Sequence, residues 1–193
     1  MQPRDLDRTL RRLEPGGWLA AARRFRTSLR TAGHDPGRLL VVGTPDEVPG
    51  LLAAHLDQAA HFSGEEALKP VLMRWHVPTG APAHLSVGIS AINSAARGAT
   101  VLVATPSTAD EHLLERLDDA RRGGAALFAL HPGSGPLEDL VHESLSLPSV
   151  GGMGLSEGWE TANHVVGAVS EPVRRRGLWR PGTRSAGTTT RLA

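Results

Sequence analysis

The sequence contains no cysteine, which excludes disulfides, thiolate catalysis and cysteine-ligated metals. It has one lysine, Lys69, so the other basic residues are arginines, a bias that fits a GC-rich coding sequence better than a physical demand. No run of about 18 apolar residues occurs, and the charged start over residues 1–15 lacks the apolar core of a signal peptide. We therefore expect a soluble, cytoplasmic protein with no membrane partner.

The sequence also lacks an excess of charge of either sign, because 21 basic residues nearly balance 20 acidic ones and leave a formal net charge of +1. This balance gives no reason to expect nucleic acid as a partner. With 193 residues, 40% of them apolar, the chain is long enough for one well-buried core and short for two. We expect one domain over residues 18–170, between an N-terminal extension (1–17) and an arginine-rich tail (171–193).

Short apolar runs bounded by turn residues recur along this domain. Runs of this kind are typical of strands that are buried on both faces, as in a parallel sheet. The clearest predicted strands are residues 39–42, 71–75, 101–104 and 126–130, and a shorter one follows within 143–148. Helical patterns separate them, so the sequence predicts an α/β fold, a three-layer sandwich with a mainly parallel, doubly wound sheet.

Two of the helical patterns carry apolar stripes on one face. Their members are Trp18, Phe25 and Leu29 in the first helix, and Leu85, Ile89 and Ile92 in the second. Together these stripes present more hydrophobic surface than one small sheet obviously covers. We therefore expect a symmetric homodimer.

The loops that follow the predicted strands are the first place to look for a site, because ligands of such sheets bind beyond the carboxyl ends of the strands. Three of these loops, over residues 43–47, 105–108 and 131–135, carry glycine, hydroxyl or histidine residues. Hydroxyls and backbone amides near a helix N-terminus favour a bound anion. The candidate ligand-binding residues are Gly43, Thr44, Thr105, Ser107, Thr108, His131 and Ser134.

Residues 98–148 run through the strand ATVLVAT, a hydroxyl-rich loop, a helix ending in ARRGG, the strand AALFAL, the loop HPGSGPLEDLVHESL and a terminal LSLP. This order resembles the sugar isomerase (SIS) domain of phosphosugar isomerases and phosphosugar-responsive regulators. RLLVVG falls where that family has its first strand, so the resemblance covers roughly residues 18–169. It implies a phosphosugar-type ligand, with the phosphate held by Thr105, Ser107 and Thr108, and paired copies of the domain.

Two loops depart from the family pattern. Pro106 removes one backbone donor from the second loop, where the family glycine is also missing. Asp46 and Glu47 stand in the first loop, where two carboxylates repel a phosphate. One interpretation is a modified or remnant phosphate cradle. The other is a plain loop in which Ser107 or Thr108 is the N-cap of the following helix.

Isomerisation of a sugar phosphate needs groups that move protons, commonly Glu and His in this family. In GWETANHVV, Glu160 and His164 are four residues apart and share one face of a predicted helix. Family members often bring a C-terminal helix of similar position over the site, so these two residues are the catalytic candidates. The competing interpretation is an ordinary pair on a helix surface.

Other features invite functional readings that the spacing does not favour. The nine histidines form no HxH or HExxH motif, so we expect no metal, and we expect no cofactor. The glycine-rich residues 149–159 match no nucleotide-binding loop and indicate a lid or connector. The tail is either disordered or an arm that docks on a partner subunit through Leu178 and Trp179.

The leading hypothesis is a SIS-like protein that binds a small phosphosugar-type anion, or is regulated by one, without isomerase activity. Pro106, Asp46 and Glu47 favour it, because each of them weakens phosphate binding where an isomerase needs it most. A divergent phosphosugar isomerase is the alternative. A structural assembly partner, which uses the scaffold only for contacts, is a second alternative.

Overall fold

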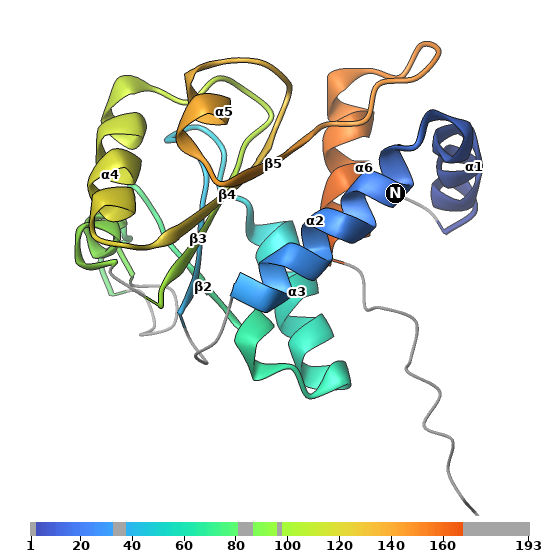
Figure 1. Cartoon of the computed structure of the whole chain (residues 1–193). Coiled ribbons are helices and arrows are strands. Elements are labelled where there is room, and N and C mark those ends of the chain that lie inside the picture. Colours follow the sequence, from blue (N-terminus) through green and yellow to red (C-terminus); the bar gives the residue numbers. More distant parts are fainter. Residues whose placement is uncertain (1–2, 33–37, 81–86, 96–97, 168–193) are drawn as a thin grey trace, which may run out of the picture.

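The computed structural model describes residues 3–32, 38–80, 87–95 and 98–167, which form a three-layer α/β arrangement (Figure 1). Five strands form one sheet in the order β2-β1-β3-β4-β5, and every neighbouring pair is parallel. The strands are β1 (Leu39–Val42), β2 (Pro70–Leu72), β3 (Thr100–Ala104), β4 (Ala126–His131) and β5 (Glu143–Ser146). The predicted fold class is therefore confirmed.

Helices cover both faces of this sheet (Figure 1). One face packs against α2, α3 and α6, and the other packs against η4, α4 and α5. The described helices are α1 (Pro3–Leu13), η1 (Glu14–Gly16), α2 (Trp18–Ala32), α3 (Gly50–Ser63), η2 (Glu66–Leu68), η4 (Ile89–Ser94), α4 (Glu111–Arg122), α5 (Pro136–Leu140) and α6 (Leu155–Gly167). Each crossover thus places a helix against the sheet, which is why the strands are apolar on both sides.

The sheet divides the core into two clusters, because successive strand residues point to opposite faces. In β3, Leu102 and Ala104 face the α2 side, whereas Val101 and Val103 face the α4 side. On the α2 side the rings of Phe25 and Phe128 meet edge to face, with centroids 5.7 Å apart. This is a favourable aromatic geometry, and it fixes α2 across β4.

The apolar stripes that suggested a dimer lie largely inside this core. Phe25 and Leu29 are 1% exposed, and Ile92 is fully buried. Trp18 is partly buried and donates from its indole Nε1 to the Ser146 carbonyl, at 2.7 Å. Leu85 lies outside the described residues. The chain's own sheet therefore covers these stripes, so they do not support the predicted homodimer.

Two predicted elements differ from the observed ones. The strand predicted over residues 71–75 ends at Leu72, because Arg74 leaves β1 and pairs with Gly88 in an isolated parallel bridge. The helix predicted around Ile89 and Ile92 is a short 3-10 helix between Gly88 and Ala95.

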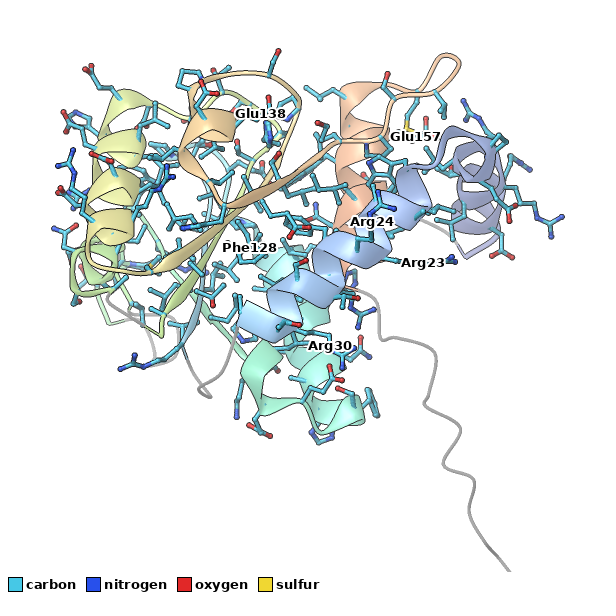
Figure 2. All side chains as sticks on the ribbon, in the orientation of Figure 1. Arg23, Arg24, Arg30, Phe128, Glu138 and Glu157 are labelled. Atoms are coloured by element: carbon cyan, nitrogen blue, oxygen red, sulfur yellow. The ribbon has the colours of Figure 1, made fainter. Side chains whose placement is uncertain are left out.

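The N-terminal extension includes a helix, α1, that packs against the domain. Its last residue, Leu13, is fully buried. Glu157 of α6 lies between the two helices and accepts a hydrogen bond from the Thr9 hydroxyl at 3.2 Å (Figure 2). Arg12 contacts the same carboxylate and donates to the carbonyl of Gly151 at 2.8 Å. In the described part of the chain, no helix has the length and apolarity to cross a membrane.

Candidate functional site

A cleft of about 280 Å³ opens at the carboxyl edge of the sheet, between the loops that follow β3 and β4. Its position follows from the topology, because parallel strands bring their carboxyl ends to one edge and neighbouring loops then face each other. The lining residues are Ser107, Thr108, Ala109, His131, Pro132, Gly133, Ser134, Gly135, Pro136 and Leu137. The structure thus brings together four predicted site residues, namely Ser107, Thr108, His131 and Ser134.

Thr105 is fully buried beneath this cleft and closes the β3 loop on itself. Its hydroxyl accepts a hydrogen bond from the Ser107 backbone N–H at 3.0 Å and lies 3.1 Å from both the carbonyl and hydroxyl oxygens of Ser107. This local turn uses one backbone donor that a phosphate would otherwise need, and Pro106 has none to offer. The loop therefore presents its remaining hydroxyls and amides as a reduced anion-binding set.

The N-cap of α4 is Asp110, and neither Ser107 nor Thr108 has this role. The Asp110 carboxylate accepts a hydrogen bond from the Leu113 backbone N–H at 2.8 Å, while its own backbone is extended. Aspartate and serine are N-caps of similar strength, so the path of the backbone selects Asp110 over the hydroxyls upstream. Ser107 and Thr108 are exposed and line the cleft instead.

The β4 loop forms the other wall of the cleft, through the sequence HPGSG. Gly133 has a φ of 151°, and a Cβ added there would meet no atom within 4 Å. The backbone of the loop is therefore unobstructed, and the exposed Ser134 adds a third hydroxyl to those of Ser107 and Thr108. The loop ends at Pro136, the first residue of the short helix α5.

His131 is the unusual residue of the site. It is the last residue of β4 and is only 3% exposed, and its Nε2 has no hydrogen-bond partner among the described residues. Burial of a polar atom without a partner costs about 1–3 kcal/mol, so native proteins rarely leave one without a reason. A ligand in the adjoining cleft that hydrogen-bonds this nitrogen would explain why it has no partner in the protein.

The β1 loop stands apart from this cleft. Thr44 pairs with Glu47 in a tight antiparallel turn, and Gly43 is required there because a Cβ would lie 2.0 Å from the Glu47 carbonyl oxygen. Neither Gly43 nor Thr44 lines the cleft. Thr44 is nevertheless 4% exposed, and its hydroxyl has no partner in the described part of the chain.

The charges around the cleft are sparse. Its lining, as far as the structure describes it, includes no Lys, Arg, Asp or Glu. The carboxylate of Asp110 lies at the start of α4, just beyond the lining residue Ala109, and Asp46 is exposed in the β1 loop. A bound anion would therefore depend on hydroxyl and backbone N–H donors without a cationic partner, which predicts weak binding.

Glu160 and His164 lie on α6 and do not line the cleft. The ring of His164 stacks against that of His55 on α3, with centroids 4.6 Å apart and planes at 34°. Burial lowers the pKa of His164, and the neighbouring His55 lowers it further. Glu160 is exposed on the same helix. His164 thus contributes to the packing of α6 on α3, on the face of the sheet opposite α4.

The cleft also includes residues that the sequence did not single out. Pro132, Gly133, Gly135 and Pro136 complete the β4 wall, and Ala109 extends the β3 wall. A signal for the first four was present in the dense proline and glycine content of HPGSGP, which marks a shaped loop. Among the described residues, no group of three or more His, Asp or Glu side chains could hold a metal ion.

The fold and the cleft define an α/β protein with a doubly wound parallel sheet and a neutral, hydroxyl-lined site beyond β3 and β4. No family model matches the chain, and no curated protein matches it in sequence. Among solved structures it is similar to "The Vibrio vulnificus NanR protein complexed with ManNAc-6P", at 12% sequence identity and a TM-score of 0.44. The similarity covers 75% of this chain and 49% of that one, so the match spans about half of that protein. A likeness at this level carries no conclusion about ligand or activity.

Proposed function

We propose that this protein is a SIS-like binding or regulatory protein whose cleft takes a small phosphosugar-type anion, without isomerase activity. The observation that carries the proposal is the gathering of three hydroxyl residues, Ser107, Thr108 and Ser134, around one cleft at the carboxyl edge. Such side chains, with the backbone amides of a glycine-rich loop, are suited to phosphate oxygens. The order of strands and loops, read from the sequence, supplies the comparison with the SIS family.

Binding without isomerisation is supported by the composition of the cleft. An isomerase needs a base within hydrogen-bond reach of the carbon-bound proton, or one water away from it. His131 is the only titratable side chain among the described residues that line the cleft. Glu160 and His164, the candidates for proton transfer, belong to α6 on the other side of the sheet. The divergent isomerase is therefore the less favoured function.

A ligand screen by thermal unfolding tests this proposal. We expect hexose 6-phosphates to raise the melting temperature only at millimolar concentration, with no turnover in an aldose–ketose isomerase assay. Ser107→Ala should weaken that binding by about 1.5–3 kcal/mol, because it removes a hydrogen bond to a charged group. Ser156→Ala provides a matched control, since Ser156 is an exposed serine of α6 outside the cleft.

The outcomes separate the two candidate functions. A shift with sugar phosphates that Ser107→Ala reduces and Ser156→Ala preserves supports binding at the cleft. Turnover that disappears in both Glu160→Gln and His164→Asn would establish the isomerase instead. No shift with any phosphorylated compound, at concentrations up to tens of millimolar, would count against the binding function.

The proposal includes a homodimer. Its support comes from the start of α3, where Val48 and Leu51 are 39% and 47% exposed. Leu155, the first residue of α6, is 56% exposed. Large apolar side chains at the surface are consistent with association, although single ones are common on monomers.

A further inference from the structure

Three neighbouring strands end in buried polar residues at the carboxyl edge. β4 ends at His131, while Thr105 follows β3 directly and Thr44 follows β1 by two residues. The register pairs Val42 with Val103 and Ala104 with Leu130. Continued by one or two residues, it places Thr44 beside Thr105 and Thr105 beside His131. A polar row therefore crosses the sheet just beyond its last apolar layer.

The side chains of the row differ in whether their polar atoms have hydrogen-bond partners. Thr105, in the middle, is hydrogen-bonded to Ser107. The flanking residues are not satisfied, because the Thr44 hydroxyl and the His131 Nε2 are both buried without a partner among the described residues. Two unpaired polar atoms thus flank one paired hydroxyl, and each carries a burial cost that a hydrogen bond to a ligand would relieve.

The position of the row is also that of a ligand site. The chain leaves β1 for β2 on one side and returns to β3 on the other, so the strand order reverses between β1 and β3. Open sheets bind ligands at this switch point. Thr44 lies on the β1 side of it, and the observed cleft lies on the β3 and β4 side, with His131 in its lining.

We propose that His131 and Thr44 are specificity-determining residues that hydrogen-bond the uncharged, hydroxyl-bearing part of the ligand. This inference rests on the proposed function, because the anionic end of the same ligand lies on Ser107, Thr108 and Ser134. Strands are about 4.8 Å apart, so the row spans roughly 10 Å from Thr44 to His131. A site of that length selects a phosphorylated sugar or polyol over inorganic phosphate. Asp46 and Glu47, beside Thr44, disfavour a second phosphate at that end.

Both unpaired atoms are shielded from solvent in the ligand-free chain, so binding requires a local rearrangement. The β3 loop, which begins at the row, is closed by the Thr105 to Ser107 hydrogen bonds, and these are local to three residues. His131 already lines the cleft, so the rearrangement that the proposal requires at this residue is a turn of its ring that presents Nε2 to the ligand. The energy gained by pairing the two buried atoms then favours the bound conformation.

The test compares two probes on matched variants, by isothermal titration of the full chain with inorganic phosphate and with a hexose 6-phosphate. We expect the wild type to prefer the hexose phosphate by at least about tenfold. His131→Leu and Thr44→Val should each lose about five- to tenfold in affinity for the hexose phosphate, the range expected for one net hydrogen bond. Their affinity for inorganic phosphate should not change. His131→Gln and Thr44→Ser should retain most of the preference.

A ligand-free measurement tests the premise independently. If the two atoms are unpaired, His131→Leu and Thr44→Val should unfold at a denaturant concentration equal to or above that of the wild type. Thr100→Val is the control, because its buried hydroxyl also has no described partner but lies at the opposite end of β3. It should leave both affinities unchanged. A marked destabilisation by His131→Leu would show that the histidine has a structural partner and would overturn the inference.

The remaining outcomes are distinct. Equal affinity for the two probes, or variants that bind the hexose phosphate like the wild type, would overturn the specificity role and leave anion binding at the cleft intact. Loss of inorganic phosphate binding in Ser107→Ala would still support that binding function. Failure of both probes to bind would overturn the proposed function and this inference together.

Discussion

At the scale of single residues, a buried group matters here for what it lacks as well as for what it contacts. Thr105 and His131 lie side by side beyond β3 and β4, but the first has its hydrogen bonds and the second does not. The β1 loop shows the same contrast. The Trp75 indole donates a hydrogen bond to the Gly43 carbonyl at 2.9 Å, whereas the hydroxyl of Thr44, the residue after Gly43, has no partner among the described residues. Residues of the first kind hold loops in place, whereas His131 and Thr44 are the residues that we propose for the ligand.

His164 makes the fold sensitive to acid. Its pKa is lowered by burial and by His55, so the folded chain binds this proton less readily than the unfolded chain. Stability from this group is therefore fully present above the ordinary pKa of about 6.5 and declines as the pH falls below it. The effect should be small, because the ring is partly exposed and screened by solvent.

Urea unfolding at pH 7.5 and pH 5.5 measures this contribution. We expect the wild type to lose more stability between the two values than His164→Asn, which cannot take up the proton. Glu160→Gln should increase the loss, since the Glu160 charge favours the protonated ring. Identical pH dependence in the wild type and His164→Asn would rule out the effect.

At the scale of elements, the start of α4 connects helix stability with the site. Asp110 caps the helix directly beyond the lining residue Ala109. Asp110→Ala should lower the free energy of unfolding by about 1 kcal/mol, because the Leu113 N–H loses its acceptor. Chemical denaturation measures this change. Asp110→Asn should keep most of the cap.

The same pair of variants also reports on the ligand. Asp110→Asn removes a negative charge near the cleft while the helix stays capped, so phosphate affinity should stay equal or rise. A drop in affinity would mean that the carboxylate contacts a cationic or hydroxyl group of the ligand. Asp110→Ala alone could not separate these effects, because it changes the helix and the charge together.

At the scale of the whole molecule, association is open to a direct measurement. The chain mass is 20.4 kDa, so light scattering at micromolar concentration should give about twice that value if the homodimer forms. Leu51→Glu should return the protein to a monomer, because it places a charge on the exposed start of α3. Gln58→Glu is the matched control, because it adds the same charge at an exposed polar position of the same helix. A monomeric wild type would exclude the dimer.

The sequence by itself determined the strands and the class of fold. The runs at 39–42, 101–104 and 126–130 are short, apolar on both faces and bounded by turn residues, which is typical of strands in a covered parallel sheet, so their assignment did not depend on distant contacts. It also predicted the loops over 105–108 and 131–135, which line the cleft, because the turn residues that mark a loop such as HPGSGP are a local signal. The interpretation in which Ser107 or Thr108 caps α4 is wrong, since Ser107, Thr108 and Asp110 are all good caps and only the backbone path selects Asp110 among them.

Only the tertiary structure decided which of these loops meet. Strand order places the β3 and β4 loops side by side and leaves Glu160 and His164 on a helix across the sheet, a relation between residues far apart in the chain that local pattern does not encode. Burial was decided in the same way. Phe25, Leu29 and Ile92 are apolar whether they face a partner or their own core, and the packing of α2 and η4 on the sheet settles it. Whether the His131 Nε2 has a hydrogen-bond partner depends on residues from several elements that pack around it, so a local sequence motif cannot predict it.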